Sequence, residues 1–329
     1  MPKFDKTKMH PPARRLSNIM RWLPFSDCIW LQRLVTKFRF YKSKNKHIRI
    51  SKLLLSHNPH DFLDSNLIKQ FSQSQLKGLG KTSCRLYNGD SNKIMPLIVY
   101  FHGGGFVYGN FNSADGGLRD MCYSTGCNIL VIKYPLAPKY KCDIAIRLCN
   151  YILTNLNIDI LYKGIILMGD SAGCSIVLNT IHSVLSQLQD TTNSIIGQIL
   201  LYPMVEEVTK DSGNKYPSIQ KYAKGCMLTK KSLIKMYKLY LPKHMTKEYF
   251  DKANPINLSF NNFPKTLIFG CEFDPLRDHA IALYNQLNQY NCNTKLINYN
   301  DITHGYFASF EKYIALSLLE IVEFFVELF

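Results

Sequence analysis

The chain has 329 residues, of which 46% are hydrophobic and 19% are charged. This is a globular composition, and it excludes collagen, coiled coil and disorder as descriptions of the whole chain. The formal net charge is +16, and residues 1–50 carry most of it, with thirteen Lys or Arg against two Asp. The basicity is therefore a feature of the N-terminal segment.

The ten cysteines are too few for a disulfide scaffold, and no C-x-x-C pair occurs among them. The N-terminus lacks an apolar signal region, and no apolar stretch is long enough to span a membrane. We therefore expect an intracellular, cytoplasmic protein. The bias toward Asn, Lys, Ile and Tyr is typical of an AT-rich genome, such as that of an intracellular bacterium or a large DNA virus, and packaging in a virus particle stays open.

The N-terminal segment 1–60 is basic, aromatic and proline-containing. Within residues 14–46, apolar side chains recur at helical spacing among Lys and Arg, which predicts amphipathic helices. We assign 1–60 to a helical cap segment and 61–329 to a catalytic domain. Contact of residues 14–46 with an anionic membrane surface is an open alternative, and no nucleic-acid partner is expected.

From about residue 94 onward, short apolar runs alternate with longer amphipathic stretches. The runs are 97–101, 128–133, 164–168, 197–201, 266–269 and 295–299. Such runs are typical of strands buried on both faces of a mostly parallel sheet. The helical patterns between and after them are 143–156, 171–188, 277–289 and 311–328. This alternation predicts an α/β fold with a doubly wound, mostly parallel sheet.

One insertion interrupts the alternation of strands and helices. Residues from about 204 to 262 contain no convincing buried strand, although 229–240 has a helical pattern. We expect this insertion to join residues 1–60 in a helical cap. The cap would cover the carboxyl edge of the sheet, where open α/β sheets place their ligands.

A serine stands at a sharp turn between a predicted strand and a predicted helix. Gly169-Asp170-Ser171-Ala172-Gly173 follows the run 164–168 and has the G-x-S-x-G pattern. In this context the turn strains the serine backbone and projects the hydroxyl above the sheet. The helix N-terminus beneath Ser171 favours developing negative charge. Ser171 is therefore the candidate nucleophile.

A second glycine-rich loop follows the run 97–101 and contains three consecutive glycines. Its backbone N–H groups are unshielded and able to stabilise an oxyanion. A phosphate cradle is the weaker interpretation, because the spacing is not G-x-G-x-x-G. The expected donors are the N–H groups of Gly103, Gly104 and Ala172, with His102 and Gly105 supporting the loop. Tyr108 and Phe106 follow, and lining of the pocket mouth and core packing are equally compatible with their pattern.

A serine nucleophile needs a base, and the base needs an orienting carboxylate, both of which follow the serine in folds with such an elbow. Among the downstream histidines, His304 follows a strand run and precedes a glycine, whereas His244 lies in the insertion and His279 inside a helix. Asp274 follows the run 266–269 at a strand end. We predict His304 as the base and Asp274 as the acid. The rival acids are Glu272, Asp278 and Asp301.

Taken together, five sequence blocks resemble the hormone-sensitive-lipase family of α/β-hydrolases, also called the GDXG lipolytic enzymes. The blocks are His102-Gly103-Gly104-Gly105-Phe106, Tyr134-Pro135-Leu136-Ala137-Pro138, Gly169-Asp170-Ser171-Ala172-Gly173, Asp274-Pro275-Leu276-Arg277-Asp278 and His304-Gly305-Tyr306. The resemblance covers about residues 90–329. It implies an α/β-hydrolase fold with a helical cap, a serine esterase or lipase, and the Ser171, Asp274 and His304 triad.

Two positions depart from the family pattern. Lys139 stands where the family usually has Glu, and Cys174 stands where it often has a second glycine. Neither belongs to the triad, so they bear on efficiency and pocket shape rather than on reaction type.

The function predicted from the sequence is hydrolysis of a small-molecule carboxylic ester through an acyl-enzyme, with no metal or organic cofactor. A non-catalytic small-ligand receptor on the same fold, or an amidase or deacetylase using the same triad, are the alternatives. The sequence does not define the acyl-chain length or the oligomeric state.

Overall fold

The computed structural model describes residues 42–90, 92, 94–156, 162–187, 195–224 and 227–329, together with Pro11. The predicted amphipathic helices within 14–46 therefore lie outside the described residues, apart from 42–46. In the described part of the chain, no helix is long and apolar enough to cross a membrane.

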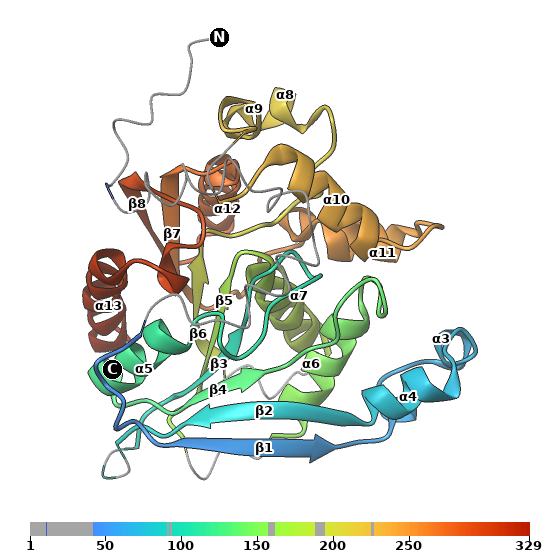
Figure 1. The fold of residues 1–329 in the computed structure, drawn as a ribbon, viewed down its shortest axis with the longest axis horizontal. Helices are drawn as coiled ribbons and strands as arrows, with labels where there is room; N and C mark the ends of the chain where they lie inside the picture. Colours follow the sequence, from blue (N-terminus) through green and yellow to red (C-terminus); the bar gives the residue numbers. More distant parts are fainter. Residues whose placement is uncertain are drawn as a thin grey trace.

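A central sheet of eight strands forms the middle layer (Figure 1). Its strands are β1 (Ile50–Ser56), β2 (Lys81–Tyr87), β3 (Leu97–Phe101), β4 (Ile129–Ile132), β5 (Ile165–Asp170), β6 (Ile195–Leu201), β7 (Lys265–Phe273) and β8 (Thr294–Thr303). They lie in the order β1-β2-β4-β3-β5-β6-β7-β8. From β4 to β8 all neighbours are parallel, whereas β2 is antiparallel to both β1 and β4. The predicted mostly parallel sheet is confirmed.

Helices cover both faces of this sheet, as its two-sided burial requires. The longer helices are α5 (Asp115–Thr125), α6 (Ile144–Thr154), α7 (Ala172–Gln187), α10 (Lys230–Tyr240), α12 (Arg277–Gln289) and α13 (Glu311–Val326). Side chains of α5 and α13 pack on one face, and those of α6, α7 and α12 pack on the other. Shorter helical segments are η3 (Pro59–Asp61), α3 (Ser65–Ile68), α4 (Gln73–Leu79), α8 (Ser212–Lys215), α9 (Pro217–Lys221), α11 (Lys247–Ala253), η4 (Pro255–Asn257) and η5 (Tyr306–Ala308).

The six strands predicted from apolar runs and the four predicted helices are present with small shifts at their ends. The structure differs from the sequence prediction in the N-terminal part of the described chain. Residues 50–56 were assigned to the helical cap segment, but they form β1, the edge strand paired with β2. At an edge, side chains need not be buried, so Leu53 and Leu54 are 38% and 59% exposed. This strand therefore lacks the buried apolar pattern by which β3 to β8 were recognised.

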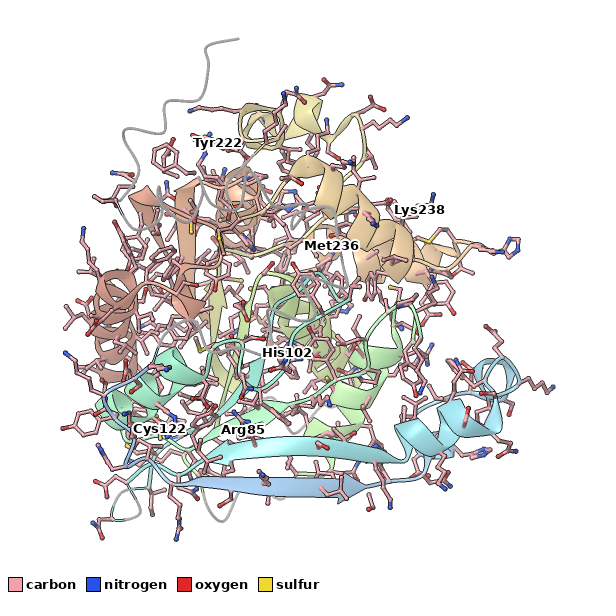
Figure 2. The ribbon with its side chains drawn as sticks, viewed as in Figure 1. Arg85, His102, Cys122, Tyr222, Met236 and Lys238 are labelled. Carbon is pink, nitrogen blue, oxygen red and sulfur yellow. The ribbon has the colours of Figure 1, made fainter. Side chains whose placement is uncertain are left out.

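The insertion at 204–262 contains α8, α9, α10, α11 and η4 and, over its described residues, no strand. Figure 1 shows these helices gathered on one side of the sheet. Helix α10 is amphipathic: Leu233, Met236 and Tyr237 are buried, whereas Lys238 is exposed. Figure 2 shows Met236 directed toward the interior and Lys238 directed outward.

Candidate functional site

Ser171 occupies the tight turn between β5 and α7. Its φ is +54°, a left-handed conformation that is costly for a residue with a side chain. The turn is held by a hydrogen bond of 2.9 Å from Ser171 N–H to the carbonyl of Leu201. A Cβ at Gly169 would lie 2.5 Å from the backbone of Gly173, and one at Gly173 would lie 2.0 Å from the carbonyl oxygen of Phe101. Only glycine fits at these two positions, so strand and helix meet closely below the serine.

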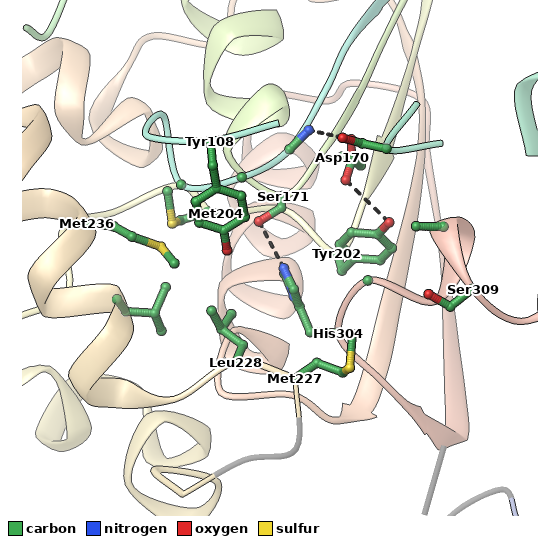
Figure 3. Close-up of a pocket in the computed structure, with 17 residues that line it drawn as sticks. Tyr108, Asp170, Ser171, Tyr202, Met204, Met227, Leu228, Met236, His304 and Ser309 are labelled. Atoms are coloured by element: carbon green, nitrogen blue, oxygen red, sulfur yellow. Dashed lines mark hydrogen bonds between the residues drawn. The ribbon is translucent and has the colours of Figure 1, made fainter. Parts of the chain in front are cut away.

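The side chains of Ser171, His304 and Asp274 form one chain of hydrogen bonds. His304 Nε2 lies 2.9 Å from Ser171 Oγ, and His304 Nδ1 lies 2.7 Å from Asp274 Oδ2 (Figure 3). Asp274 follows β7 and His304 follows β8, so the parallel strands bring them to one edge. All three side chains are buried, and Asp274 also accepts a hydrogen bond from Leu276 N–H. The structure brings together the three residues that were selected from the sequence.

The rival residues have other partners. His279 is buried in α12, and its Nδ1 accepts a hydrogen bond from Val205 N–H. Glu272 and Asp278 both contact Arg277, and Asp301 forms an ion pair with Lys312. His244 is exposed between α10 and α11. None of these side chains takes part in the hydrogen bonds of Ser171 and His304.

In the glycine-rich loop, one of the backbone N–H groups that we expected to stabilise the oxyanion has another partner. Gly103 N–H donates to Asp170 Oδ1 at 2.5 Å, so this amide is engaged within the protein and is not a free oxyanion donor. Among the described residues, no acceptor lies in hydrogen-bond geometry with the N–H groups of Gly104, Gly105 or Ala172. The expected set of Gly103, Gly104 and Ala172 is therefore corrected. The free donors are Gly104, Gly105 and Ala172.

His102 is buried and is not among the residues that line the cavity described below. Its Nδ1–H donates to the carbonyl of Gly103 at 2.8 Å, and its ring stacks on Tyr134 with centroids 4.3 Å apart. Tyr134 Oη donates in turn to the carbonyl of His102 at 2.5 Å. Burial lowers the pKa of His102 to about 4, so the ring is neutral at pH 7. These contacts fix the backbone from which the glycines extend.

Asp170 is a site residue that the sequence analysis did not select. Besides Gly103 N–H, its carboxylate accepts hydrogen bonds from Tyr100 Oη at 2.5 Å and Tyr202 Oη at 3.4 Å. The Tyr202 ring also packs edge-on against His304, with centroids 4.7 Å apart. Burial raises the pKa of Asp170, and the hydrogen bonds from Tyr100 and Gly103 oppose this rise. The only sequence signal for Asp170 is its place between glycine and serine in the elbow.

A cavity of about 130 Å³ opens beside Ser171. Figure 3 shows it bounded on one side by Tyr108, Met204 and Met236 and on the other by Tyr202 and Ser309. The lining residues are Gly103, Gly104, Gly105, Tyr108, Ser113, Asp170, Ser171, Tyr202, Met204, Met227, Leu228, Leu233, Met236, His304, Gly305, Ala308 and Ser309. Helix α10 and the segment before it thus form one wall of the cavity. Phe106, by contrast, is buried and stacks on Tyr240.

The two departures from the family pattern lie away from the reacting atoms. Lys139 is exposed, and its Nζ lies 5.0 Å from the ring centroid of Tyr140. Cys174 is fully buried, and its thiol donates to the carbonyls of Gly169 and Leu201 at 3.2 and 3.4 Å. Among the described residues, no group of three or more His, Cys, Asp or Glu could hold a metal ion.

Comparison with known proteins finds that the alpha/beta hydrolase fold family matches residues 98–308. An esterase of Gibberella moniliformis is 26% identical over 263 residues, which are 77% of this chain and 79% of the relative. An arylesterase of Saccharolobus solfataricus is 28% identical over 237 residues, which are 68% and 72% of the two chains.

Two solved structures are similar over nearly the whole chain. For a hyperthermophilic esterase from Pyrobaculum calidifontis the TM-score is 0.72 at 20% identity, covering 99% of this chain and 98% of the other. For a fungal esterase from Rhizomucor miehei the TM-score is 0.77 at 19% identity, covering 97% and 96%. At these identities the likeness concerns the fold.

Proposed function

The chain belongs to the alpha/beta hydrolase fold family, in its hormone-sensitive-lipase-type branch, and is a carboxylic-ester hydrolase; from this premise we propose that it acts through an acyl-enzyme on Ser171. The observation that carries the proposal is the continuous hydrogen-bond chain from Ser171 Oγ through His304 to Asp274. A base within hydrogen-bond reach of the hydroxyl, itself oriented by a buried carboxylate, is the arrangement that activates a serine.

In the first half-reaction, His304 Nε2 accepts the Ser171 hydroxyl proton while Ser171 Oγ attacks the ester carbonyl carbon. Asp274 accepts the Nδ1–H hydrogen bond, which fixes the tautomer and stabilises the imidazolium. His304 then donates its proton to the departing alkoxide, and an alcohol leaves. In the second half-reaction, water loses a proton to His304 and attacks the acyl carbon. The bond between the acyl carbon and Ser171 Oγ then breaks, His304 returns the proton to that oxygen, and the acid is released.

The negative charge on the carbonyl oxygen needs donors that are already in place. We assign this role to the N–H groups of Gly104, Gly105 and Ala172, because they have no acceptor among the described residues and flank Ser171. Such donors stabilise the transition state without reorganising, and the loss of one costs about 3 kcal/mol of barrier. The N-terminus of α7, which begins at Ala172, favours the same charge.

The size of the cavity favours small substrates. At about 130 Å³ it is close to the roughly 150 Å³ of an engineered apolar cavity that binds one benzene molecule. A group of about six heavy atoms fits within this space, whereas a long acyl chain would extend beyond it. We therefore propose short-chain esters rather than long-chain lipids as substrates.

Hydrolysis of p-nitrophenyl esters from two to sixteen acyl carbons, with Ser171→Ala as the matched control, tests both parts of the proposal. We expect the highest kcat/KM at six carbons or fewer, and no activity above background for Ser171→Ala. An optimum at long chains would contradict the size argument alone. If the folded wild-type protein were no faster than Ser171→Ala on any ester, the proposed acyl-enzyme mechanism would fail.

A further inference from the structure

Tyr108 stands just after the glycine loop, and its backbone N–H donates to the carbonyl of Gly104 at 3.1 Å. Its side chain lines the cavity beside Ser171, and Figure 3 shows the hydroxyl directed into that cavity. Over the described ranges of the chain, this hydroxyl has no hydrogen-bond partner. Tyr108 takes no part in the mechanism given above.

The other tyrosine hydroxyls around the site are paired. Tyr100 and Tyr202 donate to Asp170, Tyr134 donates to the carbonyl of His102, and Tyr237 donates to the carbonyl of Glu206. A tyrosine hydroxyl that is withdrawn from bulk water normally finds a partner, because leaving it unpaired is costly. The fold thus pairs the neighbouring hydroxyls and leaves that of Tyr108 available to whatever fills the cavity.

The cavity that Tyr108 lines has apolar as well as polar side chains, and the polar ones include Ser113 and Ser309. Its apolar side chains include those of Met204, Leu228 and Met236 (Figure 3). Leu233 also lines the cavity. A binding pocket of this kind derives its affinity from the apolar wall and its selectivity from the few polar groups in it. A donor in such a wall selects ligands that present an acceptor at the same place.

We propose that Tyr108 is a specificity-determining residue, whose hydroxyl donates a hydrogen bond to a second oxygen of the substrate, remote from the ester that is cleaved. The preferred substrate is then a short ester whose apolar group carries one keto, hydroxyl or ether oxygen. This inference rests on the proposed function, because it names the substrate class of the same site. A site built to pair such an oxygen discriminates against the analogue that lacks it.

Matched ester pairs test this selectivity. Ethyl 4-oxopentanoate and ethyl pentanoate differ by one oxygen on the acyl side, and 4-oxopentyl acetate and pentyl acetate differ by one on the alcohol side. The kcat/KM ratio of oxo ester to plain ester is measured for the wild-type protein and for Tyr108→Phe. Comparing ratios between enzymes cancels the difference in intrinsic reactivity within a pair. We expect Tyr108→Phe to lower the ratio about two- to tenfold in one pair.

The control is Tyr151→Phe, which also removes one phenolic oxygen. Tyr151 Oη donates to Asp61 Oδ2, away from the cavity, so both ratios stay at the wild-type value. Ratios unchanged in Tyr108→Phe for both pairs would overturn the proposal. So would a uniform fall in kcat for all four esters, since that would put the hydroxyl at the reacting carbonyl.

A binding measurement separates this inference from the proposed function. Ser171→Ala and Ser171→Ala with Tyr108→Phe are titrated with the same four esters by calorimetry. We expect the Tyr108 hydroxyl to tighten binding of one oxo ester about two- to tenfold and to leave its plain partner unchanged. This result would stand even if the wild-type protein hydrolysed none of the esters. Equal binding by the two variants would contradict the role of Tyr108 whatever the turnover.

Discussion

Replacing Gly105 with alanine should disable the oxyanion loop, because backbone strain and a steric clash both raise the free energy of the native loop in this variant. Its φ is +58°, and a residue with a Cβ pays about 1–2 kcal/mol there. The new Cβ would also lie 2.2 Å from Met236 Sδ and 2.8 Å from Met236 Cγ, well inside an ordinary contact of about 3.5–4.0 Å. Met236 is only 1% exposed and lines the cavity, so its Cγ and Sδ would have to move into that cavity.

Overpacking a buried position adds about 1–3 kcal/mol, so keeping the native loop would cost about 2–5 kcal/mol in Gly105→Ala. A shift of the loop avoids that cost, and it moves the N–H groups of Gly104 and Gly105 off the oxyanion. Loss of one such donor lowers kcat by about 10²–10³. We therefore expect a fall of this size in kcat for p-nitrophenyl acetate, with a lower thermal midpoint.

Two further variants distinguish the effect of the steric clash on kcat from the effect of backbone strain. Gly126→Ala has the same kind of strain, at φ +72°, but its Cβ would meet only Asp90 Cβ at an ordinary 3.5 Å, far from the site. It should lower the thermal midpoint and leave kcat unchanged. Adding Met236→Ala to Gly105→Ala removes the clashing sulfur and should recover at least tenfold in kcat. A Gly105→Ala enzyme with wild-type kcat would refute the assignment of the loop.

Three other predictions follow from the contacts of the site. Asp274→Asn should lower kcat about 10⁴-fold, measured with p-nitrophenyl acetate, because the amide favours the wrong tautomer of His304; a loss below tenfold would contradict the role of Asp274. Burial lowers the pKa of His102 to about 4 and that of His279 to about 3, whereas the unfolded chain protonates near 6.5. The free energy of unfolding should therefore fall as pH drops from about 6.5 to 4, by up to about 1.4 kcal/mol per pH unit for each histidine. Urea titrations at several pH values should show that the free energy of unfolding falls less steeply with pH in His279→Asn than in the wild-type protein. An equal slope in the two proteins would contradict this explanation. Cys174→Gly should lower the free energy of unfolding by about 1–2 kcal/mol, since it places glycine within α7, and should leave kcat/KM within a few-fold.

The sequence was most informative where local patterns decide the structure. The strands β3 and β4 are buried on both faces, so they appear in the sequence as unbroken apolar runs. The elbow at Ser171 could be located because its G-x-S-x-G pattern is local, although the contact that requires Gly173 is with Phe101, far away in the chain. His304 and Asp274 could be placed because strands β7 and β8 end just before them.

Helix α5 was missed because two glycines, at positions 116 and 117, stand in its first turn. Packing explains one of them, since a Cβ at Gly117 would lie 2.8 Å from the ring of Phe307. That contact joins segments far apart in the chain, so no local pattern reveals it. Strand β2 was missed because polar residues interrupt it, as its partly covered face allows.

The free N–H groups of the glycine-rich loop could not be predicted from the sequence for a similar reason. The three consecutive glycines identify the loop, but which N–H groups are free depends on Asp170, which is 67 residues away and accepts from Gly103. The ambiguity at Tyr108 and Phe106 has the same origin. Their neighbours on α10 come from the insertion, and only the fold shows that Phe106 packs on Tyr240 while Tyr108 faces the cavity.

The central claim is that Ser171 is the nucleophile of an ester hydrolase. Treatment with diethyl p-nitrophenyl phosphate, followed by intact mass and peptide mapping, tests it most directly, because this reagent traps a serine that is activated by a neighbouring base. The account predicts one diethylphosphoryl group per chain, located on Ser171, with loss of p-nitrophenyl acetate hydrolysis in proportion to labelling and no labelling of Ser171→Ala. Labelling at another residue, or full hydrolytic activity in a protein labelled at Ser171, would contradict it.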